Sequence, residues 1–159
     1  MKQQQGVTIA LFRIMFGILY LDMAIQKAPW KNFGWLEGWI KREIQHPTFD
    51  WYKNFLETVV LQNFTLFGWL TFVTEMALGL GLLLGLFTVL AGLGGALWQV
   101  NIALGAYSVP GEWYWVWPLL IAPQLLFAAV RAGRTWGLDG PLSRVEGSGD
   151  LARLARLIS

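Results

Sequence analysis

Four long apolar stretches constrain the fold of this chain more than any other feature of its sequence. They cover about residues 7–26, 64–86, 89–107 and 113–131, and consist mainly of Leu, Ile, Val, Phe, Ala and Gly. A helix of about 17–25 residues crosses the roughly 30 Å hydrocarbon layer of a bilayer. An apolar helix can also be buried in a large soluble protein, but 159 residues are too few to bury four of them in water. We therefore predict an all-α integral membrane four-helix bundle.

The composition agrees with a membrane protein and excludes several kinds of site. Hydrophobic residues make up 55% of the chain and charged residues 14%, and the mean hydropathy is +0.47. The formal net charge is only +2, without a run of Lys and Arg, so we expect no nucleic-acid partner. The absence of cysteine excludes disulfides, Fe–S clusters and thiolate metal sites within this chain. We predict no metal site.

Two segments outside the four stretches are predicted to be amphipathic. The first loop, residues 28–63, carries aromatic residues beside charges and is broken at His46-Pro47 into two short helices. Trp and Tyr favour the headgroup level of a bilayer, so we expect both helices to lie on the membrane surface. After the membrane domain (residues 1–140), residues 141–159 form a linker and an amphipathic helix, "DLARLARLIS". That helix is predicted to lie in the interface or against a partner subunit.

Polar side chains inside the apolar stretches are the candidate site residues, because such groups are costly in a membrane and usually face the bundle interior. Glu75, Asn101 and Gln124 each lie roughly 17–18 Å from one end of their stretch, at about 1.5 Å per residue, and so near the same level. Arg13 and Gln99 lie in the first and third stretches. We predict that these groups form a buried polar pocket near the middle of the bundle.

The sequence leaves open how Glu75 is neutralised. One alternative is an ion pair with Arg13; the other is a protonated Glu75 hydrogen-bonded to Asn101 or Gln124. A third interpretation gives the polar residues no function beyond hydrogen bonds between helices. Lys27 is either a cation anchored at the membrane surface or a ligand of the pocket. Arg134 and Asp139 form either a helix-end cap with a salt bridge or an anion site.

Three patches resemble the DoxX family, and within it the DoxD-type small subunit of thiosulfate:quinone oxidoreductase. In "RIMFGILYLDMAIQK", Arg13, Gly17 and Lys27 match the family pattern, and "EMALGLGLLLGLFT" is similar to its Glu-led, Gly-spaced second helix. "RAGRTWGLDG" resembles the family's Gly-x-Gly/Ala-Arg-x-x-x-Leu-Asp ending through Gly133, Arg134, Leu138 and Asp139. The resemblance covers about residues 10–140.

This resemblance implies a membrane subunit of a redox complex that passes electrons from thiosulfate to a quinone. Glu75 and Arg13 would then be the catalytic residues, and the remaining candidates would bind quinone or a small anion: Lys27, Gln99, Asn101, Gln124, Arg134 and Asp139. No cofactor is expected to be covalently bound, and a quinone is the expected ligand. The expected partners are the lipid bilayer and a second subunit or further copies of this chain. A non-catalytic scaffold that docks other proteins is the alternative, and a small-solute carrier is the least favoured hypothesis.

The resemblance also implies the cytoplasmic (inner) membrane of a prokaryote. An even number of spans puts both termini on one side, and the Lys and Arg residues outside the spans are slightly more numerous there than in the first loop. Cytoplasmic loops carry the excess of Lys and Arg. We therefore expect both termini in the cytoplasm.

Overall fold

The structure, a computed structural model, describes residues 2–144, and every regular element in that range is helical. Three segments have the length and composition of membrane spans: Gln4–Lys31, Asp50–Leu84 and Thr88–Ala106. The helices at their centres are α1 (Lys2–Gln26), α4 (Phe64–Leu84) and α5 (Thr88–Ala106). The structure thus confirms an all-α chain with the character of a membrane protein.

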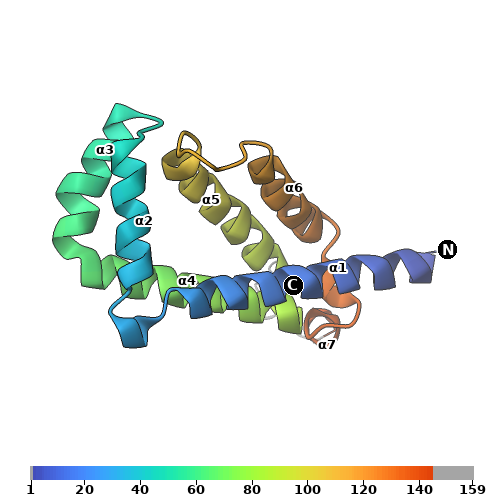
Figure 1. The fold of residues 1–159 in the computed structure, drawn as a ribbon. Helices are drawn as coiled ribbons and strands as arrows, with labels where there is room; N and C mark the ends of the chain where they lie inside the picture. Colours follow the sequence, from blue (N-terminus) through green and yellow to red (C-terminus); the bar gives the residue numbers. More distant parts are fainter. Residues whose placement is uncertain (1, 145–159) are drawn as a thin grey trace.

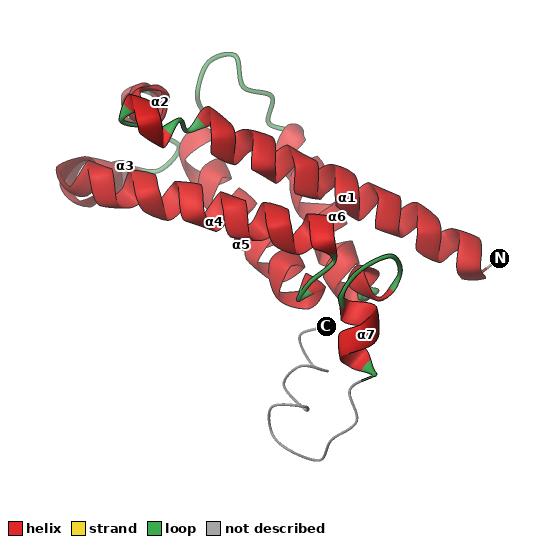
Figure 2. Cartoon of the chain, turned by 90° about the horizontal axis from the view of Figure 1, so that it is seen from below, coloured by secondary structure: helices red, strands yellow, loops and turns green. Residues whose placement is uncertain are grey.

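Helices α1 and α4 form one antiparallel pair, which Figures 1 and 2 both show side by side. Small residues allow the two backbones to come close: Gly17 lies against Leu83, and Gly79 lies against Leu21. A Cβ atom at Gly17 would be 2.5 Å from the backbone nitrogen of Leu83, so no larger residue fits there. Such small-residue contacts are common where helices pack in a membrane.

Helix α5 packs on α6 (Val116–Ala129) in the same way, with Gly92 against Gln124 and Ala128. However, α6 has 14 residues, which is about 21 Å and shorter than the hydrocarbon layer. The sequence-based boundaries of 113–131 were too wide because Trp113–Trp115 form a turn and Arg131 adopts a left-handed conformation with φ of 50°. A fourth span, and with it the four-helix bundle, stays a prediction.

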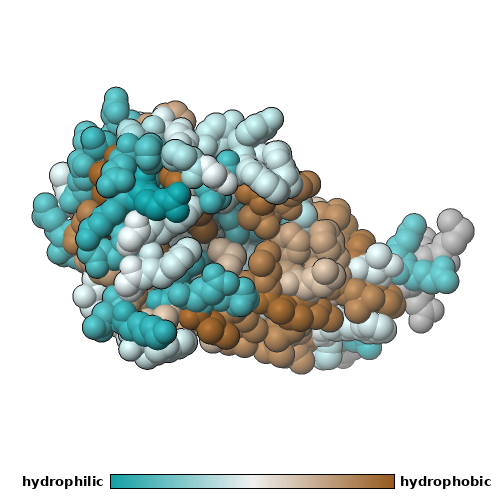
Figure 3. Space-filling model, viewed as in Figure 1, coloured by the Kyte–Doolittle hydropathy of each residue, from teal (hydrophilic) through white to brown (hydrophobic). Residues whose placement is uncertain are grey.

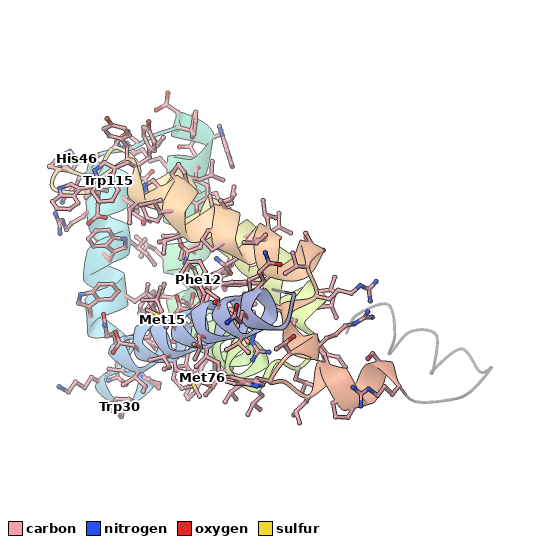
Figure 4. All side chains as sticks on the ribbon, turned by 90° about the vertical axis from the view of Figure 1, so that its right-hand side faces the viewer. Phe12, Met15, Trp30, His46, Met76 and Trp115 are labelled. Atoms are coloured by element: carbon pink, nitrogen blue, oxygen red, sulfur yellow. The ribbon has the colours of Figure 1, made fainter. Side chains whose placement is uncertain are left out.

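The first loop folds into α2 (Gly34–Gln45) and α3 (Asp50–Phe55), separated at His46-Pro47 as the sequence predicts. A 3-10 turn, Pro29–Lys31, precedes α2; a π-helical turn, Leu56–Val60, and a 3-10 turn, Leu61–Asn63, join α3 to α4. Figure 1 shows α2 crossing the end of the α1–α4 pair, and Figure 4 shows Trp30 and His46 near its two ends.

Hydrophilic residues gather over α2 and α3, whereas hydrophobic surface extends along the α1–α4 pair (Figure 3). This distribution agrees with the prediction that α2 and α3 lie on the membrane surface.

Two apolar clusters hold the helices together. One lies among the long helices and includes Phe16, Tyr20, Leu82 and Phe127. The other lies beneath the first loop and consists of Phe33, Leu36, Ile40, Tyr52, Leu56 and Val60. The chain continues from α6 through a 3-10 turn, Ala132–Arg134, to the short helix α7 (Asp139–Ser143). The predicted C-terminal amphipathic helix lies outside the described residues.

Candidate functional site

A cavity of about 520 Å³ lies between the first-loop helices and the long helices. Aromatic side chains form much of its wall: Trp35, Trp39, Tyr52, Phe55, Trp98 and Trp117. The charged and amide side chains that reach the wall are Lys27, Glu43, Glu75, Gln99, Asn101 and Glu112. A mostly apolar cavity with a few convergent polar groups is typical of a small-molecule site.

Glu75 lies on α4 and is fully buried. The Lys27 Nζ atom, from the residue after α1, lies 3.2 Å from Glu75 Oε2. The indole N–H of Trp98 donates to Glu75 Oε1 over 3.3 Å. The Lys27 ammonium also lies 5.1 Å from the centre of a Trp35 ring, within the range of a cation–π contact. The ion pair with Lys27 therefore neutralises Glu75, and Lys27 is a residue of the pocket and not only a surface anchor.

The predicted alternatives for Glu75, an ion pair with Arg13 or hydrogen bonds to Asn101 or Gln124, were wrong. The α1–α4 packing contacts, Gly17 with Leu83 and Gly79 with Leu21, set the relative position of the two helices. On that alignment Glu75 is level with residue 25, twelve residues from Arg13, which corresponds to about 18 Å along the helix. Side chains also lean toward the N-terminus of their helix, so Arg13 and Glu75 point apart.

Two predicted amides from α5 do reach the cavity. Asn101 accepts hydrogen bonds from the Tyr52 hydroxyl at its backbone oxygen (3.1 Å) and at Oδ1 (3.2 Å). Gln99 is 1% exposed, and neither amide atom has a partner at hydrogen-bond geometry within residues 2–144, although the Tyr20 hydroxyl lies near it. The indole nitrogen of Trp117 is likewise buried without a partner in that range. Buried polar groups are rarely left without a hydrogen bond, so these two side chains are available to a ligand.

Gln124 is buried but is not part of the cavity wall. Its Oε1 accepts a hydrogen bond from the Tyr20 hydroxyl (3.1 Å), and its Nε2 donates to the backbone oxygen of Leu120 (2.8 Å). The Tyr20 hydroxyl also reaches the backbone oxygen of Gly95 (3.0 Å). Gln124 thus links α6 to α1 and α5. This agrees with the interpretation that the polar residue forms hydrogen bonds between helices.

Arg13 and Asp139 lie at the α4–α5 turn, in a group that we call the turn cluster: Arg13, Gly85, Thr88, Trp136, Gly137 and Asp139. The carboxylate of Asp139 accepts hydrogen bonds from the backbone nitrogens of Phe87 (2.7 Å) and Thr88 (2.8 Å), and so caps α5. Arg13 Nη2 donates to the backbone oxygen of Trp136 (2.9 Å), and its charge is attracted by Asp139. Neither Arg13 nor Asp139 lines the cavity.

For Asp139, the structure therefore supports the helix-end cap, which was one of the two alternatives predicted for Arg134 and Asp139. Arg134 lies in the turn Ala132–Arg134 with its side chain exposed. Neither Arg134 nor Asp139 lines the cavity that Glu75 borders. Of the residues predicted to share one pocket, Glu75, Gln99 and Asn101 reach the cavity, whereas Arg13 belongs to the turn cluster and Gln124 packs against α1 and α5.

Sequence reasoning did not identify most of the cavity wall, including Glu43, Tyr52, Trp98, Glu112 and Trp117. For Glu43 a signal was present, because Leu36, Ile40 and Glu43 lie four and three residues apart and share the buried face of α2. A carboxylate on the apolar face of an amphipathic helix is the same kind of anomaly as Glu75. Within the described range, the structure contains no group of three His, Asp or Glu side chains that could hold a metal ion.

Comparison with known proteins gives one family. The model of the family described as "TQO small subunit DoxD" matches residues 8–158, nearly the whole chain. No curated protein and no solved structure matches.

Proposed function

The chain belongs to the DoxD family, the small subunit of thiosulfate:quinone oxidoreductase (TQO), and on that premise we propose that it binds the quinone of such a complex in the cavity beside Glu75. It is a membrane protein of a redox complex, and the proposal adds the location and the chemical class of the ligand. The observation that supports this proposal most strongly concerns Gln99. Its side-chain amide is fully buried on the cavity wall and has no hydrogen-bond partner among the described residues.

Charge favours a quinone over a small sulfur anion in this cavity. Lys27 is the one cation among the described lining residues, and Glu75 pairs with it. Glu112 adds a further carboxyl group to the wall. Thiosulfate is a dianion that carboxylates repel, and the repulsion is strong where the dielectric constant is low. A neutral quinone ring suits aromatic walls, and its two carbonyl oxygens need donors such as the free N–H groups of Gln99 and Trp117.

The Lys27–Glu75 pair suits the reduction of a quinone. Two electrons put negative charge on the quinone oxygens, and a fixed ammonium in a water-poor site stabilises charge that develops beside it. Glu75 holds Lys27 in the apolar wall, and together they form a pair that can hold and release a proton. Glu75 and Lys27 are thus the residues that we assign to the chemistry, whereas Arg13 has a structural role in the turn cluster.

The proposal also includes the membrane in which the chain lies and the side on which its termini lie. We place the chain in the cytoplasmic membrane of a prokaryote, with both termini in the cytoplasm. Since Lys27 is paired inside the protein, it no longer counts as a free cation of the first loop. Without Lys27 in the count for the first loop, the excess of Lys and Arg on the side of the termini is larger.

Binding of a short-chain quinone to the purified chain in detergent tests the proposal. Gln99→Leu removes the free amide and is expected to weaken binding about 5–30-fold, the effect of one lost hydrogen bond to a buried group. Gln124→Leu is the matched control, because Gln124 is buried next to α5 but outside the cavity wall, and it should bind as wild type. A wild-type chain that binds no quinone, yet still assembles with its complex, would instead support the scaffold alternative.

A further inference from the structure

One face of α5 carries a row of polar contacts along the cavity. Trp98, Asn101 and Gly105 are three and four residues apart and so share a helix face. At the inner end Trp98 donates to Glu75, and in the middle Asn101 accepts from the Tyr52 hydroxyl. The row extends about 10 Å along the helix.

Glu43 occupies the outer end of this row. Its carboxylate lies against Gly105, where a Cβ atom would be 2.5 Å from Glu43 Oε2. The side chain lines the cavity and the residue is 7% exposed. Its neighbours in the chain on the other face of α2, Arg42 and Gln45, are exposed. Glu43 therefore stands between the first-loop surface and the inside of the cavity.

The surroundings of Glu43 favour its protonated form near neutral pH. Burial raises the pKa of Glu43 to about 7, and the N–H of Trp39, which acts in the opposite direction, does not offset it. The titratable or charged groups that face the same cavity from the neighbouring elements are Lys27, Tyr52, Glu75 and Glu112. Lys27 is committed to Glu75, and the other three offer no positive charge.

We propose that Glu43 is the proton-uptake residue of the cavity and passes protons from the first-loop surface along the α5 face to the quinone beside Glu75. This inference rests on the proposed function. A carboxyl group lies at the surface end, a second one lies at the inner end, and the Tyr52 hydroxyl stands between them as a group that can exchange protons. Water molecules bound by these few polar side chains would bridge the gaps between them.

The proposed reaction reduces a quinone to a quinol. The quinone accepts two electrons, which the complex takes from thiosulfate as the reductant, and two protons, so that one O–H bond forms at each oxygen. Each proton leaves the carboxyl group of Glu43, and the resulting carboxylate recovers a proton from water on the first-loop side. The protons of the reaction thus come from the membrane face opposite the termini.

The test uses the intact complex, with thiosulfate as electron donor and a short-chain quinone as acceptor, over a range of pH. The wild-type rate should fall as the pH rises through about 7, because the protonated form of Glu43 is lost. Glu43→Gln should lower the rate at pH 6 at least about tenfold, as for the loss of an acid catalyst, and should abolish this step in the profile. Glu43→Asp keeps the acid and should keep the step. Glu37→Gln, at an exposed ion pair with Lys41 on the same helix, is the control and should leave the profile unchanged.

Infrared spectra of the wild-type chain should contain a protonated carboxyl band that titrates near pH 7 and that Glu43→Gln removes, a readout that holds even if the complex of a variant is unstable. Quinone binding with a Glu43→Gln profile like that of wild type would overturn this inference and leave the proposed function intact. A wild-type chain that binds no quinone would overturn both.

Discussion

The two ends of the α1–α4 pair both bury charged side chains, but they differ in what lies beside those side chains. At the turn cluster, Arg13 and Asp139 lie against backbone, and a Cβ atom at Gly137 would be 2.5 Å from Arg13 Nη1. At the first-loop end, Lys27 and Glu75 border a cavity of about 520 Å³. The first arrangement holds a turn together, whereas the second can hold a ligand.

Hydrogen bonding alone does not separate the two regions. Arg13 Nε and Nη1 lack hydrogen-bond partners within residues 2–144, as the amide of Gln99 does. The difference is that Gln99 faces the cavity, while Arg13 is enclosed by Gly85 and Gly137. In this protein we therefore propose a function for a buried charge where room for a guest lies next to it.

The largest effect on stability is expected at the turn cluster. Asp139→Ala removes the acceptor of two backbone N–H groups and leaves Arg13 without its neighbouring negative charge. The free energy of unfolding in detergent should fall by about 3–5 kcal/mol. Asp22→Ala, where the carboxylate is exposed and accepts from Gln26, should change it by no more than about 0.5 kcal/mol. Equal free energies of unfolding for the two variants would contradict the structural role of Asp139.

An intermediate effect is expected from the pairing of Glu75. In a double-mutant cycle, Lys27→Met and Glu75→Gln should show a coupling energy of about 1–3 kcal/mol, because removing one partner alone leaves a buried charge. Arg13→Met and Glu75→Gln should be additive within about 0.5 kcal/mol, since the two residues do not touch. Coupling of Glu75 with Arg13 in place of Lys27 would contradict the relative position of α1 and α4.

The smallest effect is expected where two buried amides differ only in their partners. Without quinone, Gln99→Leu should leave the free energy of unfolding within about 1 kcal/mol of wild type, or raise it, since it removes polar atoms that lack partners. Gln124→Leu should lower it by about 1–2 kcal/mol, because the Tyr20 hydroxyl keeps only the backbone oxygen of Gly95 as an acceptor. Denaturant titration of both variants in the same detergent measures the difference.

Much of the fold could be predicted from the sequence because helix length and apolar character are local properties. The break at His46-Pro47 and the positions of α4 and α5 lie within two or three residues of the predicted ones. The length of α6 was harder to predict, because Trp113–Trp115 are apolar enough to extend a stretch but form a turn. Hydropathy does not distinguish an apolar turn from an apolar helix.

The candidate site could be predicted only in part because it depends on how the helices align. Glu75, Gln99, Asn101 and Lys27 were all identified as polar residues in apolar surroundings, and all reach the cavity. The alternative in which Arg13 pairs with Glu75 assumed a depth for each helix in the membrane, and the packing of Gly17 and Gly79 sets a different alignment. Contacts of this kind are tertiary, and no spacing within one helix reveals them.

Photolabelling tests the central claim, that the cavity beside Glu75 holds a quinone, most directly. The intact complex would be illuminated with a photoreactive quinone analogue, and the labelled peptides would be identified by mass spectrometry. The account predicts label on α2 and on the α5 segment around Gln99 and Asn101, and loss of that label when excess unmodified quinone is present. Label confined to the turn cluster, or label on α2 and α5 that excess quinone does not displace, would contradict it.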